Sequence, residues 1–318
     1  MMIDLLLVIV GAAMVLFGAD RLTDSASALA RKMNISEMVI GLTIVAFGTS
    51  MPEFVISLMS AAKDSADMAV GNVVGSNIFN TLFIVGLSAL VCPIMVKPVS
   101  IRRDVPFAVF ATILLLVLMR NAELSTLDGA LLIAVFIVFM IVTVRGAKTE
   151  KSVSANDADT DTTESAVNQA PAWKSTLWLV AGLALLIWGS DIFVDAATGI
   201  AKSLNISDGV IGLTIVALGT SLPELATSVV AAKKGSADMA IGNVLGSNVF
   251  NILWILGFTS IVCPMRIESI TAIDMTVMGA SMLLLWLFAF TKYKIERWEG
   301  AVMSLLFIGY ITYLIATL

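Results

Sequence analysis

The stretch GLTIVAFGTSMPEF at residues 41–54 returns almost unchanged as GLTIVALGTSLPEL at residues 212–225. A second stretch, ADMAVGNVVGSNIFN at 66–80, returns as ADMAIGNVLGSNVFN at 237–251. The offset is 171 residues in both cases, and the same offset aligns the flanking segments 18–36 and 189–207. A constant offset over so long a stretch is typical of an internal duplication. The sequence therefore predicts two copies of one structural unit.

The composition indicates that these units lie in lipid. Of the 318 residues, 58% are hydrophobic and only 14% are charged, whereas soluble domains are about 45–50% apolar and about 25% charged. A net charge of −5 without a basic run argues against a nucleic-acid partner. The chain has no histidine, the commonest general base and zinc ligand. Cys92 and Cys263 are too few for a disulfide framework or a metal cluster. We expect an integral membrane protein that is not an enzyme and carries no cofactor.

Ten segments are apolar enough to cross a bilayer, which takes about 20 residues of helix. They lie at about 4–29, 36–62, 68–92, 104–120, 126–145, 173–202, 207–232, 239–263, 273–291 and 298–317. The polar stretch 146–172 separates the fifth from the sixth and is typical of a linker. The predicted organisation is a first five-helix repeat over 1–145, a linker over 146–172, and a second five-helix repeat over 173–318.

An odd number of helices in each repeat means that the second repeat crosses the membrane in the opposite sense to the first. The fold class is therefore all-α, with ten transmembrane helices arranged as two inverted five-helix repeats. Inverted repeats are an architecture of secondary transporters, which hold their substrate near the midplane between the two halves.

Lysines and arginines predict the orientation. One set of predicted loops carries fourteen of them, and the opposite set carries only Lys63, Arg120, Lys202 and Arg266. Because basic loops stay in the cytoplasm, we expect the 146–172 linker inside and both termini outside the cell.

Two glutamates lie in the repeated motifs at membrane depth. Glu53 follows Pro52 in the second predicted helix, and Glu224 follows Pro223 in the seventh. Proline cannot donate a hydrogen bond to the helix ladder, so each helix is expected to unwind locally and turn backbone carbonyls towards a cavity. Ionisable residues inside a membrane are functional-site candidates. A kinked helix with an internally hydrogen-bonded glutamate is the alternative, but it does not explain why both copies keep the carboxylate and its oxygen partners.

The same motifs supply further oxygen atoms around the two carboxylates. The candidates are Thr49, Ser50, Ser76 and Asn80 in the first copy, and Thr220, Ser221, Ser247 and Asn251 in the second. Each serine–asparagine pair has a spacing of four and shares a helix face. A set with oxygen donors, and without imidazole or thiolate, suits a hard cation such as Ca²⁺.

The paired GTSxPE and GNxxGSNxFN motifs on ten helices resemble the sodium/calcium exchangers of the cation/calcium antiporter superfamily, and in particular its prokaryotic members. The resemblance implies Na⁺/Ca²⁺ antiport by alternating access in a prokaryotic plasma membrane, with one chain sufficient to form the site. It implies Glu53 and Glu224 as the Ca²⁺ carboxylates. The remaining implied ligands of Ca²⁺ or Na⁺ are Thr49, Ser50, Thr220, Ser221, Ser76, Ser247, Asn80, Asn251 and the carbonyls of Ala46 and Ala217.

Asn251 stands where some members of the family, including potassium-dependent ones, have aspartate, so we expect exchange that does not require K⁺. A Ca²⁺/H⁺ antiporter of the same superfamily is the nearest alternative, in which the two glutamates would bind protons. A passive cation channel would use similar ligands, usually around a symmetric pore. An intramembrane enzyme is disfavoured because the sequence shows no nucleophile–base pair.

Four aspartates occupy matching places in the first and sixth predicted helices. They are Asp20, Asp24, Asp191 and Asp195. We expect them to solvate or cap the helix ends, or else to line an ion entry path.

Overall fold

Long apolar helices make up most of the computed structural model, which describes residues 2–156, 171–204 and 217–317. Within these ranges seven helices are long and apolar enough to cross a membrane, and a bent helix pair over 37–62 makes an eighth. Large apolar side chains such as Ile3, Leu127 and Leu305 are exposed on the outside of the bundle. Such a surface is stable in lipid and unfavourable in water.

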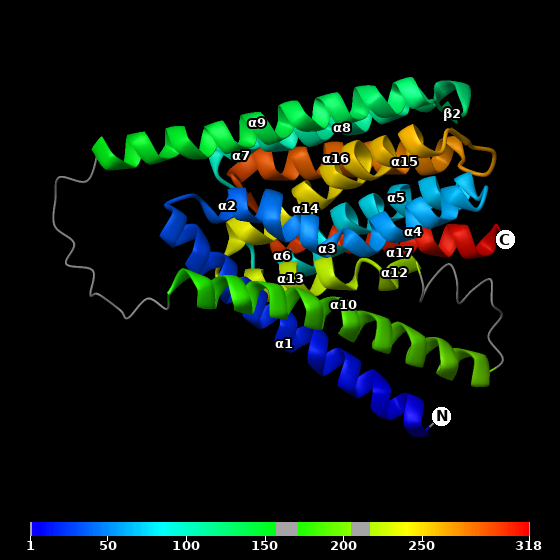
Figure 1. Ribbon diagram of the computed structural model, residues 1–318, viewed down its shortest axis with the longest axis horizontal. Helices are drawn as coiled ribbons and strands as arrows, with labels where there is room; N and C mark the ends of the chain where they lie inside the picture. Colours follow the sequence, from blue (N-terminus) through cyan, green and yellow to red (C-terminus); the bar gives the residue numbers. More distant parts are fainter. Residues whose placement is uncertain (1, 157–170, 205–216, 318) are drawn as a thin grey trace.

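The first half of the chain runs from α1 to α9 (Figure 1). Its elements are α1 (Met2–Met33), α2 (Glu37–Ile40), the π-helix η1 (Gly41–Val45), α3 (Ala46–Thr49), α4 (Met51–Ala62), α5 (Ala66–Ile78), the π-helix η2 (Phe79–Ile84), α6 (Val85–Val91), β1 (Ile94–Met95), α7 (Pro98–Arg102), α8 (Asp104–Leu118), the 3₁₀-helix η3 (Met119–Asn121), β2 (Glu123–Leu124) and α9 (Thr126–Asn156).

The second half repeats this order, without counterparts of α7 and η3 among its described elements. Its described elements are α10 (Ala172–Ser203), α12 (Ala217–Gly219), α13 (Leu222–Lys233), α14 (Ala237–Val249), the π-helix η5 (Phe250–Leu256), α15 (Gly257–Val262), β3 (Met265–Arg266), α16 (Ala272–Lys292), β4 (Lys294–Ile295) and α17 (Arg297–Ala316).

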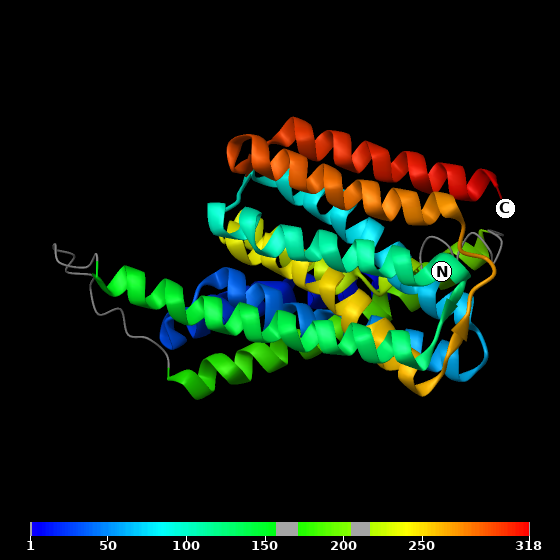
Figure 2. The same cartoon turned by 90° about the horizontal axis from the view of Figure 1, so that it is seen from above.

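Two spans form the centre of the bundle. In the spans over 66–91 and 237–262, which contain α5 and α14, 78% and 83% of the apolar window is buried, against 22–33% in the other five. The remaining helices surround these two, with α16 and α17 along one edge (Figure 2) and α1 and α10 on another flank (Figure 1). The motif-bearing segments predicted to hold the site are therefore the ones shielded from lipid.

The two halves are related by a pseudo-two-fold axis, as the short strands show. Strand β1 pairs antiparallel with β4, with Ile94 opposite Ile295. Strand β2 pairs antiparallel with β3, with Leu124 opposite Met265. Exchanging each residue for its equivalent 171 positions away converts the first pair into the second, register included. Each half thus contributes one strand to each sheet.

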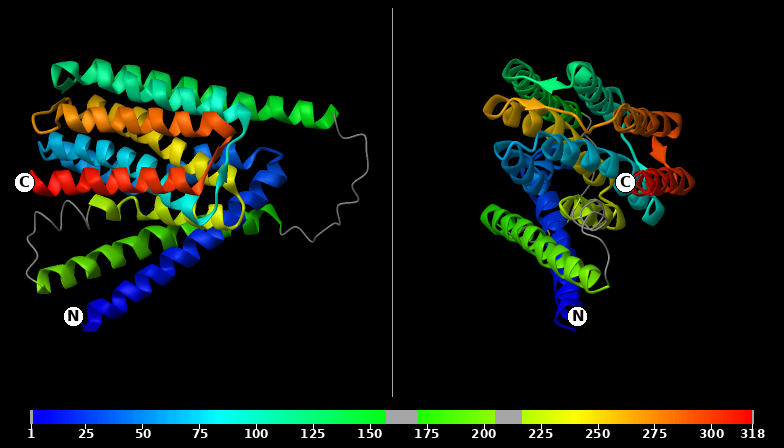
Figure 3. Two further views of the ribbon diagram at one scale, coloured as in Figure 1. Left: turned by 180° about the vertical axis from the view of Figure 1, so that it is seen from behind. Right: turned by 90° about the vertical axis from the view of Figure 1, so that its right-hand side faces the viewer.

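Helices α1 and α10 are equivalent under the same offset, and they cross each other side by side along one flank (Figure 3). Gly11 lies against Gly189, and Gly18 lies against Gly182. The partner number falls as the residue number rises, so the two helices are antiparallel. A Cβ atom at Gly11 would lie 2.8 Å from the Gly189 carbonyl oxygen, so glycine is what permits this close approach.

The structure confirms the predicted class, an all-α membrane protein with inverted halves. The count of ten transmembrane helices stays a prediction, because α8 has only 15 residues and the start of the seventh predicted helix lies outside the described residues. The division of the chain into repeats at residues 145 and 173 also stays a prediction.

The first part of the predicted polar linker is helical. Helix α9 continues past residue 146 to Asn156, and α10 begins at Ala172 (Figure 2). Extending an existing helix into residues such as Ala147, Lys148 and Glu150 costs little, because nucleation is already complete.

Candidate cation-binding site

Each GTSxPE motif breaks its helix, as the sequence predicts. Helix α3 ends at Thr49, Ser50 has a non-helical ψ of 8° although its N–H still donates to the Ala46 carbonyl oxygen at 3.0 Å, and α4 restarts with proline in its first turn. The two parts are bent by 46°. Ser221 has ψ of 10° at the equivalent break before α13. The proline ring lacks the N–H that would continue the first helix, but it fits the first turn of a new one.

This break places both glutamates in the first turn of a helix at the centre of the protein. Glu53 lies in the first turn of α4 and Glu224 in the first turn of α13, and both are 0% exposed. The free N–H groups of a helix N-terminus favour a carboxylate there. They do not replace a counter-charge, so two buried carboxylates in one protein interior call for bound metal cations or bound protons.

Hydrogen bonds across the two halves join the glutamates to the opposite motif. Ser50 Oγ donates to Glu224 Oε1 at 2.9 Å, and Ser221 Oγ donates to Glu53 Oε1 at 2.8 Å. The hydroxyl of Ser221 also lies 3.2 Å from Ser76 Oγ. Ser247 Oγ lies 3.4 Å from Glu224 Oε1. The two motifs, 171 residues apart in sequence, therefore form one site.

Several oxygens of this site are buried and have no partner among the described residues. They include the second carboxylate oxygen of each glutamate, Oε2, and the side-chain oxygens of Asn80 and Asn251. Buried polar atoms in proteins are otherwise almost always hydrogen-bonded, because an unpaired one costs about 1–3 kcal/mol. Asn80 and Asn251 lie four residues beyond Ser76 and Ser247, whose hydroxyls contact the hydrogen-bond networks of the glutamates. Unpaired oxygens of the two carboxylates themselves are suited to coordinate a cation.

Two π-helical segments carry the asparagines. Asn80 lies in η2 and Asn251 in η5, and both side chains are at most 1% exposed. A π turn is wider than an α turn, and such segments are frequent at functional sites. Asn251 Nδ2 donates to Asn77 Oδ1 at 3.0 Å, which fixes the amide and leaves its own Oδ1 unpaired.

A second pair of asparagines supports the glutamate backbone. Asn72 Nδ2 lies 3.3 Å from the Glu53 carbonyl oxygen, and Asn243 Nδ2 lies 3.4 Å from that of Glu224. Asn243 Oδ1 lies 3.3 Å from Thr49 Oγ1. Sequence reasoning did not single out these residues, although each is the second residue of a GNVxGSN motif and both copies keep it.

The other sequence-predicted residues lie at or next to the break. Ala46 is buried at the start of α3, and Thr220, half-buried, directly precedes Ser221. Ala217 begins α12, and its side chain is outside the described residues. The geometry brings together Glu53, Glu224, Ser50, Ser221, Ser76 and Ser247 by direct hydrogen bonds. It leaves the predicted carbonyl ligands Ala46 and Ala217 as candidates.

An oxygen-only site between two inverted helical halves is the arrangement of a membrane transporter for hard cations. The chain matches the family model described as sodium/calcium exchanger protein over residues 3–145 and 174–316, and it belongs to this family.

Relatives match along nearly the whole chain. CaxA of Alkalimonas amylolytica is 41% identical over 317 residues, with 98% of each chain covered. Sodium/calcium exchanger MaX1 of Methanosarcina acetivorans is 32% identical over 345 residues, again with 98% of each covered. The structure of the sodium–calcium exchanger NCX_Mj soaked with Na⁺ and Sr²⁺ superposes with a TM-score of 0.84 at 32% identity, covering 98% of both chains.

Proposed function

We propose that this protein exchanges Na⁺ for Ca²⁺ across the membrane, with both ions bound in turn at the site between Glu53 and Glu224. The observation that carries the proposal is the pair of fully buried carboxylates, each with one unpaired oxygen. Their combined charge balances one Ca²⁺ or two Na⁺. The inverted halves support alternating access, by which the site opens to one side at a time.

The ligand roles belong to the same proposal. Glu53 and Glu224 supply charge, while Thr49, Ser50, Ser76 and Asn80 with their equivalents Thr220, Ser221, Ser247 and Asn251 supply neutral oxygens, helped by the Ala46 and Ala217 carbonyls. Neutral oxygens suit a dehydrated metal ion. A proton needs only the carboxylates, so this donor set favours Na⁺ over H⁺ as counter-ion.

The counter-ion is the point that separates this proposal from a Ca²⁺/H⁺ antiporter. Purified protein in proteoliposomes is given external ⁴⁵Ca²⁺ with either an outward Na⁺ gradient or an outward proton gradient. We expect uptake with the Na⁺ gradient and background uptake with the proton gradient alone. Uptake driven equally well by protons without Na⁺ would favour the alternative.

The orientation is also proposed, from the bias of basic residues. The 146–172 linker lies in the cytoplasm of a prokaryotic cell and both termini lie outside its plasma membrane. A protease-cleavable tag inserted within 157–168 should be cut in inside-out vesicles and protected in intact spheroplasts. Cleavage from the outside of spheroplasts would reverse the topology.

A further inference from the structure

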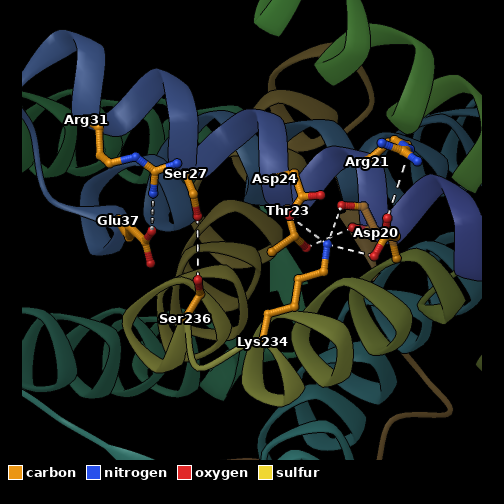
Figure 4. A network of polar contacts seen from close by, with 10 residues as sticks. Asp20, Arg21, Thr23, Asp24, Ser27, Arg31, Glu37, Lys234 and Ser236 are labelled. Atoms are coloured by element: carbon orange, nitrogen blue, oxygen red, sulfur yellow. Dashed lines mark hydrogen bonds and ion pairs between the residues drawn. The ribbon is translucent and has the colours of Figure 1, made fainter. Parts of the chain in front are cut away.

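One lysine joins helix α1 to the core at the end of the bundle where the linker begins. Lys234, in the turn between α13 and α14, has its Nζ 2.6 Å from both Asp20 Oδ1 and Asp24 Oδ1 (Figure 4). The same Nζ donates to the Asp20 backbone carbonyl oxygen at 3.0 Å. Both aspartates lie on one face of α1, four residues apart. We call Lys234, Asp20 and Asp24 the linker-side cluster.

The linker-side cluster has an equivalent in the other repeat. The offset of 171 residues maps Lys234 onto Lys63, and Asp20 and Asp24 onto Asp191 and Asp195 of α10. We call these three residues the opposite cluster. In the structure all three are exposed, and within the described ranges none of them forms an ion pair. The two clusters therefore contain the same residue types, but among the described residues only the linker-side cluster forms ion pairs.

A pair of hydroxyl groups shows the same asymmetry. Ser27 Oγ of α1 lies 3.5 Å from Ser236 Oγ beside the linker-side cluster (Figure 4). Their equivalents are Thr198 and Ser65. Thr198 Oγ1 is buried without a hydrogen-bond partner in the described part of the chain, and Ser65 is exposed. Thr198 could therefore form with Ser65 the hydroxyl contact that Ser27 forms with Ser236, but in this structure the two do not meet.

Equivalent residues of the core are also more buried at the linker-side end than at the opposite end. Met239 in α14 is 0% exposed in a core cluster that includes residues of α1, with α2 and η1 also packed on α14, whereas its equivalent Met68 in α5 is 63% exposed. Ala226 is 7% exposed and its equivalent Val55 is 47% exposed. Helix α1 packs against α13 at the linker-side end of the core, and the described residues equivalent to Met239 and Ala226 at the other end are exposed.

We propose that the two clusters form alternately, and that each one holds the α1–α10 pair against one end of the core. Because α1 and α10 contact each other through glycines along their crossing, they can move as one unit. A shift that separates Lys234 from Asp20 and Asp24 would bring Lys63 to Asp191 and Asp195, and Ser65 to Thr198. This inference rests on the proposed function, since alternating closure is what an exchanger requires.

The ion pairs of the linker-side cluster are weak enough to break and form again during transport. The side chains of Lys234, Asp20 and Asp24 are 28%, 41% and 56% exposed, so water screens the ion pairs and keeps them weak. Burial lowers the pKa of Lys234, but its hydrogen bonds to Asp20 and Asp24 and their charges outweigh this and raise that pKa above the ordinary value. Lys234 therefore keeps its charge at the pH of transport measurements. One cluster replaces an equivalent one, so neither state is strongly favoured.

Cysteine accessibility tests the proposal without any transported ion. In a Cys92→Ala, Cys263→Ala background, Met239→Cys or Met68→Cys is introduced as a reporter. Its rate of modification by a small water-soluble thiosulfonate is then measured on purified protein in choline buffer. Lys234→Ala should raise the rate at Met239→Cys about fivefold, on the scale of a weak ion pair, and lower the rate at Met68→Cys.

Lys63→Ala is the matched control, because it removes the same charge from the equivalent position. It should shift both rates in the opposite direction, and Lys234→Arg should leave them as in the parent. Asp24→Asn and Asp195→Asn repeat the comparison if a lysine variant does not purify as a single folded species. Shifts in the same direction for both lysines, or no shift for either, would overturn the proposal. Opposite shifts in a protein that lacks Na⁺/Ca²⁺ exchange would instead overturn the proposed function alone.

Discussion

Glu53→Gln and Glu224→Gln are each expected to abolish Ca²⁺ exchange, by at least about 100-fold, while the protein stays folded. Each change removes half of the negative charge that balances Ca²⁺ at a fully buried site. Removing one partner of a buried charge pair costs about 3–5 kcal/mol, and about 1.4 kcal/mol corresponds to a tenfold change in affinity.

Folding should survive because glutamine keeps the contacts that the structure shows. Its Oε1 can still accept the hydrogen bond from Ser221 at position 53, or from Ser50 at position 224. The supporting amides of Asn72 and Asn243 bind backbone carbonyls, which the substitution does not change.

The measurement is Na⁺-driven ⁴⁵Ca²⁺ uptake in proteoliposomes, with size-exclusion profiles to establish folding. Glu268→Gln is the matched control, since its side chain is 77% exposed outside the site and the same neutralisation there should leave uptake unchanged. Near-normal uptake in a folded variant at position 53 or 224 would remove that glutamate from the site.

Potassium should be unnecessary in the wild type, and Asn251→Asp should make exchange depend on pH or K⁺. Two carboxylates balance one Ca²⁺ or two Na⁺ without a further ion. Among the described residues no third acidic, histidine or cysteine side chain joins them. A third carboxylate would leave one negative charge in excess in a desolvated pocket, and a proton or a monovalent cation would neutralise it.

Asn251 Oδ1 is the atom that makes this substitution informative. It is buried without a partner in the described part of the chain, one turn beyond Ser247, which contacts Glu224, so we expect an aspartate oxygen placed there to add its charge to the site. A single bound proton changes occupancy by up to about tenfold per pH unit. Exchange is titrated between pH 6 and 8, with and without K⁺, for the wild type, Asn251→Asp and the control Asn121→Asp, whose side chain is exposed. A strict K⁺ requirement in the wild type would contradict our interpretation of this asparagine.

Features repeated in both copies were predictable from the sequence. The breaks at Ser50 and Ser221 follow from proline, which cannot continue a helix. The meeting of Glu53 with Ser221, and of Glu224 with Ser50, follows from two inverted copies that place equivalent motifs on opposite sides of one axis.

Features that depend on tertiary contacts were not predictable. The π turns around Asn80 and Asn251 have no sequence pattern that distinguishes them from α turns. Asp20 and Asp24 do not cap a helix end, because α1 continues nine residues beyond Asp24 to Met33, although both side chains are exposed. They are stabilised instead by Lys234, which is more than 200 residues away in sequence.

The central claim, that one buried oxygen site serves both ions, is tested most directly by following Ca²⁺ and Na⁺ in the same proteoliposomes. Vesicles are loaded with ²²Na⁺ and placed in ⁴⁵Ca²⁺ buffer without K⁺. We predict that Ca²⁺ entry saturates, that Na⁺ exit accompanies it, and that removing either ion stops the movement of the other. Ca²⁺ entry that continues without internal Na⁺, or that rises without saturation, would contradict the account.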